Sequence, residues 1–264
     1  MSAPPRARRD GPPRADWQVP ATQTALVVGF FALWEAGAAV GVLDPLTWSR
    51  PSVIAAELVD LVGTPETVND LAATLTTLAV GFLIGAAGGI GIGIVVARLR
   101  RVQAVVSTYL VALQSVPLLV FYPVLLTIFG LNRGPTIIVV AAVTTVPVAL
   151  NTTAGLGAIP RGLQRLATSL LLSRSAAYRK VYLPAAIPLI FPGLRVGFLA
   201  ALVTTIGMEF IVASAGLGYR VGQSYHTFAV DRMYANIVVV CVLAILVNVV
   251  LTRIERSLRR DVTT

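Results

Sequence analysis

The sequence has one cysteine, one histidine and one lysine in 264 residues, and only 12% of its residues are charged. A single cysteine, Cys241, excludes an internal disulfide framework, and one cysteine with one histidine leaves no metal-ligand spacing. Lys180 follows no glycine-rich phosphate loop, so a P-loop nucleotide site is excluded. His226 lies far from any strained serine turn, which excludes a Ser–His–acid hydrolase. We therefore expect no enzymatic activity, no metal and no cofactor in this chain.

Hydrophobic residues make up 56% of the chain and charged residues 12%, whereas charged residues make up about 25% of a typical soluble domain. The composition therefore indicates a polytopic membrane protein of the all-α class, since helices satisfy their own backbone in lipid. The net charge of +9 at first suggests a nucleic-acid partner. The basic residues flank apolar runs, however, and form no face with aromatic residues, which argues against nucleic acid.

Six apolar stretches are long enough to cross or nearly cross a bilayer, at about 22–42, 71–97, 102–132, 135–150, 193–213 and 233–252. We expect about six transmembrane helices in a domain spanning 21–256. Residues 1–20 are expected to be a disordered cytoplasmic tail and 257–264 a second cytoplasmic tail. Between the first two spans, Ser52–Val62 also looks helical. Pro147 and Asn151 are expected to end the fourth span, and Pro192 and Gly193 to lead into the fifth.

Glycine recurs at every fourth position of the second span, at Gly81, Gly85, Gly89 and Gly93. These residues share one helical face, where the missing side chain lets another backbone approach closely. We favour packing within the chain over a ligand site. Two prolines, Pro117 and Pro123, interrupt the third span; they indicate either plain kinks or a break that borders a transport pathway.

Basic residues are strongly segregated between the two sides of the membrane. With six spans, 17 of the 21 Arg and Lys residues fall on the side that holds both termini. Because cytoplasmic loops are enriched in Arg and Lys, both termini and the loop 161–188 are predicted to be cytoplasmic. This loop contains five basic residues and no acidic one, and its first half has a helical apolar stripe. Such a loop must contact lipid headgroups or a partner protein.

The end of this loop reads YRKVYLPAAIPLIFPGLR over Tyr178–Arg195 and resembles the cytoplasmic loop of binding-protein-dependent ABC importer permeases. The family motif runs Glu-Ala-Ala, three residues, Gly, nine residues, Ile, any residue, Leu-Pro. Leu183 and Pro184 match its Leu-Pro, and Val181 takes the Ile place. The similarity covers roughly 71–256 and is strongest to the nitrate, sulfonate and taurine branch, with a type I importer permease fold.

The resemblance implies a permease subunit in the cell inner membrane, importing a small solute such as a sulfonate, nitrate, a related organic anion or a vitamin precursor. It implies a second permease subunit, two cytoplasmic ABC ATPase subunits that bind ATP, an extracytoplasmic solute-binding protein and surrounding lipid as partners. The residues we assign to ATPase coupling lie in the loop: Leu170, Leu171, Ser173, Ala176, Tyr178, Arg179, Leu183 and Pro184. Those assigned to the substrate pathway are Gln114, Ser115, Tyr122, Thr145 and Glu209.

The motif is incomplete. Its Glu-Ala-Ala falls at Arg165, Leu166 and Ala167, and its glycine, which permits a turn between two short helices, falls at Leu171. Leu171 therefore predicts a continuous helix or a shifted turn. These departures leave a degenerate, non-transporting membrane partner open as an alternative. A secondary carrier is a further alternative, although the spans lack the midplane charges that such carriers use.

Several pathway residues also have a plainer interpretation. Gln114 and Ser115 can satisfy the carbonyl freed by Pro117. Tyr122 is explained equally by packing or by anchoring at the interface. Glu209 is expected either in the pathway or paired with an external arginine such as Arg220.

Overall fold

The computed structural model describes residues 18–260, which are helical with no strand. Residues 1–17, most of the predicted N-terminal tail, and 261–264 of the predicted C-terminal tail lie outside the described residues. The helical elements are α1 (Gln18–Ala39), α2 (Pro51–Leu61), α3 (Pro65–Arg98), α4 (Arg100–Gln114), η1 (Leu118–Phe121), α5 (Tyr122–Phe129), α6 (Gly134–Gly157), α7 (Arg161–Ser169), α8 (Arg174–Ala177), η2 (Tyr178–Tyr182), α9 (Leu183–Val212), α10 (Leu217–His226) and α11 (Val230–Arg260).

Four helical stretches of the described residues are long and apolar enough to cross a membrane: Pro65–Arg98, Gly134–Gly157, Ser175–His226 and Val230–Ser257. A fifth span results if Gln103–Gln114 and Leu118–Phe129, which meet at a 72° bend, are taken together. The bend contains Pro117, as the sequence predicted. The predicted first span is helical and forms α1, but α1 is not among the described helices that are long and apolar enough to cross a membrane.

The contact between α3 and α6 is built on the glycine stripe of α3. A Cβ atom on Gly85 would lie 2.4 Å from the carbonyl oxygen of Ala141, and one on Gly89 would lie 2.7 Å from that of Thr145. Gly81 and Gly93 meet side chains of α6 in the same way. The prediction that this stripe serves packing within the chain is confirmed, because only glycine allows the two backbones to come this close.

Helix α9 completes a three-helix core. Ala201 and Leu202 of α9 are buried with Leu78 of α3 and Val140 of α6. The rings of Phe82 and Phe198 meet edge to face, with centroids 4.9 Å apart. These apolar and aromatic contacts hold the middle of the bundle together.

Two helix boundaries predicted from prolines are wrong. Helix α6 continues through Pro147 to Gly157, and α9 begins at Leu183, before Pro188 and Pro192. A proline removes one backbone hydrogen bond, and side chains and neighbouring helices can satisfy the freed carbonyl. The side-chain amide of Asn151 donates to the carbonyl of Pro147 at 2.9 Å, so Asn151 lies within the helix that it was expected to end.

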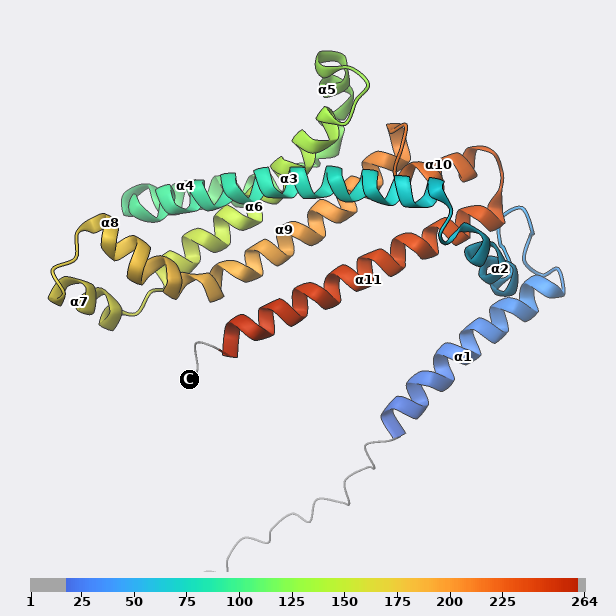
Figure 1. Ribbon diagram of the computed structural model, residues 1–264, viewed down its shortest axis with the longest axis horizontal. Coiled ribbons are helices and arrows are strands. Elements are labelled where there is room, and N and C mark those ends of the chain that lie inside the picture. The colour runs from blue at the N-terminus through green and yellow to red at the C-terminus, as the bar shows by residue number, and fades with distance from the viewer. Residues whose placement is uncertain (1–17, 261–264) are drawn as a thin grey trace, which may run out of the picture.

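Helix α1 extends away from the bundle and meets it only near its C-terminal end (Figure 1). There the carboxylate of Glu35 accepts hydrogen bonds from the backbone N–H and the hydroxyl of Ser52, at 2.9 and 2.8 Å. Ser52 lies in the first turn of α2, so Glu35 satisfies a free donor at that helix start. The ring of Trp34 packs between Trp48 and Tyr234. The rest of the α1 surface is largely exposed and apolar, as a lipid-facing helix requires.

Helix α11 lies along the bundle and is fixed at both ends. Arg195 of α9 donates to Glu255 at 2.8 Å and to Asn248 at 3.0 Å. Ala235 at its other end is buried with Ile54 and Leu61 of α2. The elements α7 and α8 lie at one end of the bundle, and α2 and α10 at the opposite end (Figure 1). The α7–α8 loop and the α2–α10 region are therefore separated by the length of the spans.

Gly85→Ala is expected to destabilise the protein by about 1–3 kcal/mol, because the new methyl group would overlap a backbone carbonyl that cannot move aside. Gly91→Ala on the same helix is the control, since a Cβ atom there has no neighbour within 4 Å. Thermal unfolding in detergent measures both. Equal unfolding temperatures for the two variants would contradict the close α3–α6 contact.

Candidate functional site

The turn between α7 and α8 is formed at Leu171, the position of the family motif glycine. The N–H of Leu171 donates to the carbonyl of Thr168 at 3.0 Å, and that of Leu172 to the carbonyl of Ala167 at 3.2 Å. This pair of bonds is the Schellman helix end, which places Leu171 in the left-handed region with φ of 48°. The expectation of a continuous helix or a shifted turn is wrong. The backbone turns where the motif predicts, at a strain of about 1–2 kcal/mol for a non-glycine residue.

The residues assigned to coupling divide into an exposed and an inward-facing group. Leu170, Leu171, Ser173 and Arg179 are exposed, whereas Ala176 and Tyr178 are half-buried. The hydroxyl of Ser173 accepts the N–H of Ala176 at 3.3 Å and so caps the short helix α8. The structure thus places apolar and basic side chains on the exposed surface of the segment from the end of α7 to η2.

Tyr178 connects this loop to the spans. Its ring lies beside the buried cluster of Leu156, Ile159, Ala186 and Ile190, which joins the ends of α6 and α9. Leu183 packs on the same cluster, whereas Pro184 is exposed. Tyr178 therefore anchors the loop to the adjacent ends of two spans.

The guanidinium of Arg98 lies over the Tyr178 ring, 4.3 Å from its centroid, in a cation–π contact. Because Arg98 is the last residue of α3, this contact adds a third span to those that meet the loop. The sequence analysis did not assign Arg98 to the site. The sequence shows only that Arg98 is an arginine at the end of a span, and nothing in it identifies Tyr178 as the partner of Arg98.

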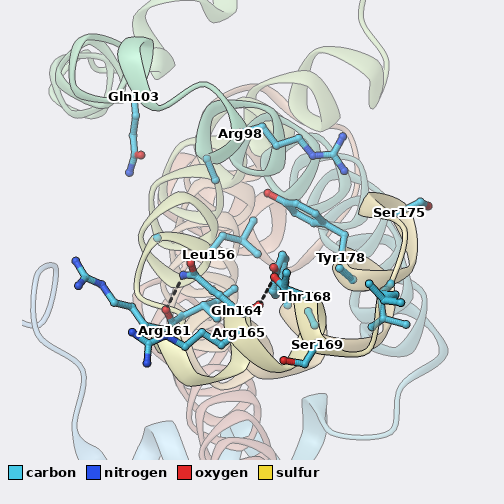
Figure 2. A pocket seen from close by; sticks show the side chains of 18 residues that line it. Arg98, Gln103, Leu156, Arg161, Gln164, Arg165, Thr168, Ser169, Ser175 and Tyr178 are labelled. Atoms are coloured by element: carbon cyan, nitrogen blue, oxygen red, sulfur yellow. Dashed lines mark hydrogen bonds between the residues drawn. The ribbon is translucent and has the colours of Figure 1, made fainter.

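A hollow of about 1870 Å³ opens at this end of the bundle between the ends of α3 and α6, α4 and the α7–α8 segment. Figure 2 shows Arg98, Arg161 and Arg165 on its walls, pointing in different directions. Gln164 donates to the carbonyl of Ile159 at 3.1 Å and holds the start of α7 against the end of α6. Among the residues that line the hollow none is acidic, so the surface favours an acidic partner.

At the opposite end, Asp70 of α3 holds α10 in place. One oxygen of Asp70 accepts the N–H of Gly216 at 2.8 Å, and the other accepts the Nε of Arg220 at 2.5 Å. Arg220 also reaches Glu66, at 3.2 Å. Arg220 therefore pairs with two carboxylates of α3 and not with Glu209, so the predicted Glu209–Arg220 pair is wrong.

Glu209 is 3% exposed and has a different role. One of its oxygens accepts the hydroxyl of Thr74 at 2.7 Å and the N–H of Gly218 at 3.1 Å. Thr74 in turn accepts the N–H of Leu217 at 2.9 Å. Glu209 and Thr74 together satisfy the free donors at the start of α10, where a negative charge is also favoured by the helix dipole.

A small cavity of about 190 Å³ lies beside Glu209, between α5, the start of α6 and the end of α9. Of the predicted pathway residues, Tyr122 and Glu209 line it, together with Thr136 and Arg133. Gln114 and Ser115 are exposed at the bend after α4. The hydroxyl of Thr145 donates to carbonyls of Ala141 and Gly85 within the α3–α6 contact. The structure thus brings two of the five predicted pathway residues together.

The described residues form a polytopic helical bundle with a basic helical loop at one end and an ion-pair network at the other. The family described as "Binding-protein-dependent transport system inner membrane component" matches residues 89–260, and the chain belongs to this family. It is accordingly a multi-pass inner-membrane permease component of an importer that works with a binding protein.

The curated relatives are permeases of small-solute importers. The chain is 28% identical to the taurine transport system permease protein TauC of Escherichia coli strain K12, over 93% of both chains. It is 26% identical to a putative aliphatic sulfonates transport permease protein, SsuC, of Bacillus subtilis strain 168, over 95% of this chain and 90% of that one. Nitrate import permease protein NrtB of Synechocystis is 27% identical, over 67% of this chain and 64% of that one.

Among solved structures, an inward-facing conformation of the MetNI methionine ABC transporter aligns with a TM-score of 0.63 and 20% identity. The alignment covers 73% of this chain and 96% of that one. At this identity the likeness establishes the shared fold, in agreement with the predicted type I importer permease architecture.

Asp70→Ala is expected to lower the free energy of unfolding by about 3 kcal/mol, because it leaves the N–H of Gly216 without its acceptor and Arg220 with Glu66 alone. The control is Asp60→Ala, which removes an exposed carboxylate from the preceding helix α2. Unfolding in detergent measures both variants. If Asp70→Ala is as stable as Asp60→Ala, the network does not hold α10.

Proposed function

We propose that this chain is the permease subunit of an ABC importer for a small solute such as a sulfonate, nitrate, a related organic anion or a vitamin precursor. It would assemble with a second permease, the same chain or a different one, two cytoplasmic ATPase subunits that bind ATP, and an extracytoplasmic solute-binding protein. The observation that carries the proposal is the helix–turn–helix loop, which turns at the motif glycine position although the glycine is absent. The relatives' names support the substrate class.

The segregation of basic residues supports an orientation with the α7–α8 loop and both termini in the cytoplasm. The network of Glu66, Asp70 and Arg220 and the small cavity would then lie on the outer side, where the solute-binding protein delivers its cargo. The hollow lined by arginines would face the ATPase.

In this mechanism the loop receives the movement of the ATPase and passes it to the spans. Exposed Leu170 and Arg179 would contact the ATPase, and Tyr178 would transmit the displacement to α3, α6 and α9 through Arg98 and the buried cluster beside it. Leu183 and Pro184 would fix the return of the chain into the bilayer. The spans would move as rigid bodies and open the pathway to one side at a time.

For the pathway we propose the outer cavity lined by Tyr122 and Glu209. Both side chains are buried and reach the cavity from different elements, α5 and α9. Gln114 and Ser115, at the bend between α4 and η1, would line the route further along. Thr145 is the weakest candidate, because its hydroxyl is already bonded within the α3–α6 contact.

The docking surface is tested by Leu170→Asp combined with Arg179→Glu, which places negative charge where the partner is expected to be acidic. We expect the amount of ATPase that co-purifies with this chain, using the ATPase encoded beside it, to fall at least about tenfold. The reason is that like charges at an interface are strongly unfavourable. The control, Arg253→Glu with Arg256→Glu, changes exposed arginines near the end of α11, outside the loop. A wild-type chain that recruits no ATPase would contradict the proposed function.

The pathway is tested by Glu209→Gln, which keeps an oxygen for Thr74 and Gly218 and removes the charge beside the cavity. We expect solute uptake into proteoliposomes to fall about tenfold, equivalent to about 1.4 kcal/mol, with ATPase binding unchanged. Glu35→Gln serves as the control, because Glu35 also accepts a backbone N–H at a helix start, that of α2. If Glu209→Gln takes up solute at the wild-type rate, Glu209 has no role in the pathway.

A further inference from the structure

Leu171 combines two unfavourable features. Its backbone is in the left-handed region, where a side chain is strained, and its side chain is 92% exposed. Of the described residues other than glycine, only Phe228, with φ of 55°, shares that backbone region. A glycine at position 171 would form the same turn without strain and without exposing a leucine.

The fold of this chain gives no reason for the leucine. The two hydrogen bonds that close the turn involve backbone atoms alone, and any residue able to adopt this conformation would form them. Ala167 is buried and Leu172 is half-buried, so the inward side of the turn is filled without Leu171. Its side chain points outward, next to Leu170, which is also exposed.

The position of the turn indicates what covers Leu171. The α7–α8 turn projects beyond the ends of α3 and α6 at its end of the bundle (Figure 1). It lies at the rim of a hollow whose lining contains Arg161 and Arg165 and no acidic residue. An apolar side chain beside basic ones fits a protein groove that has an apolar pocket and an acidic rim.

We propose that Leu171 is a docking residue whose side chain enters an apolar pocket of the cytoplasmic ATPase subunit, and that the backbone strain at this turn is retained for that contact. The proposal rests on the proposed function, since it assumes that the loop meets an ATPase. It adds a specific requirement, namely that the partner has a pocket large enough for a leucine where a glycine-bearing loop would leave it empty.

Leu171→Gly tests this by separating stability from binding. In the permease alone, the variant should unfold about 2–4 °C higher than wild type, because the strain is relieved. Its affinity for the ATPase should fall about 10- to 100-fold, as expected for the loss of a buried leucine. Leu171→Met should retain most of the affinity, and Leu171→Asn, which tolerates the left-handed region, should lose it.

Phe228→Gly is the matched control, because Phe228 has the same backbone conformation and is 79% exposed, but lies just before α11, at the other end of the bundle. It should gain stability without losing affinity for the ATPase. If Leu171→Gly binds the ATPase as tightly as wild type, the docking role is wrong while the proposed function stands. If wild type does not bind the ATPase either, the proposed function fails first.

A photo-crosslinker placed at Leu171→Cys identifies what covers the side chain. The native cysteine is replaced in the same chain by Cys241→Ser, since Cys241 is exposed. In nanodiscs containing the assembled complex, we expect the crosslink on the ATPase subunit. A crosslink to lipid would overturn the proposal and would make Leu171 a membrane contact.

Discussion

The close contact between α3 and α6 is the constraint on which the rest of the structure depends. Helices in lipid gain little from hiding apolar surface from water, so they associate through contacts between closely packed backbones. Four glycines spaced by one helical turn give α3 such a surface, and no side chain of α3 fits at these positions against α6. Helix α9 then packs on both, and the three helices hold the loop at one end and the ion-pair network at the other.

The two ends are held by different kinds of interaction, which suits different tasks. At the α7–α8 end, Tyr178 lies on a buried apolar cluster and under a guanidinium, so packing and a cation–π contact hold the loop. At the other end, carboxylates of α3 and α9 hold α10 through backbone N–H groups and Arg220. Hydrogen bonds and ion pairs depend on direction, so they can break and form again as helices move.

Sequence reasoning found the features that repeat or follow a motif. The glycine period, the break at Pro117 and the helical loop are visible because each depends on neighbouring residues. It failed where the partner is distant: it offered Glu209 as a partner for Arg220, whereas the packing of α10 on α3 pairs Arg220 with Asp70. The contact of Arg98 with Tyr178 was missed for the same reason. Helix ends were misplaced because packing overrode the prolines.

The strength of these contacts decides where the protein can move. Separating α3 from α6 would open a gap that no side chain fills, so these helices are expected to move together as one body. Because α3 carries Arg98 at one end and Asp70 at the other, a displacement of the loop would, in the proposed mechanism, reach the network along this helix. The contacts that must yield are then those of α10 with Asp70 and Glu209. The small cavity borders Glu209, so in the proposed mechanism movement at the loop would change the cavity wall.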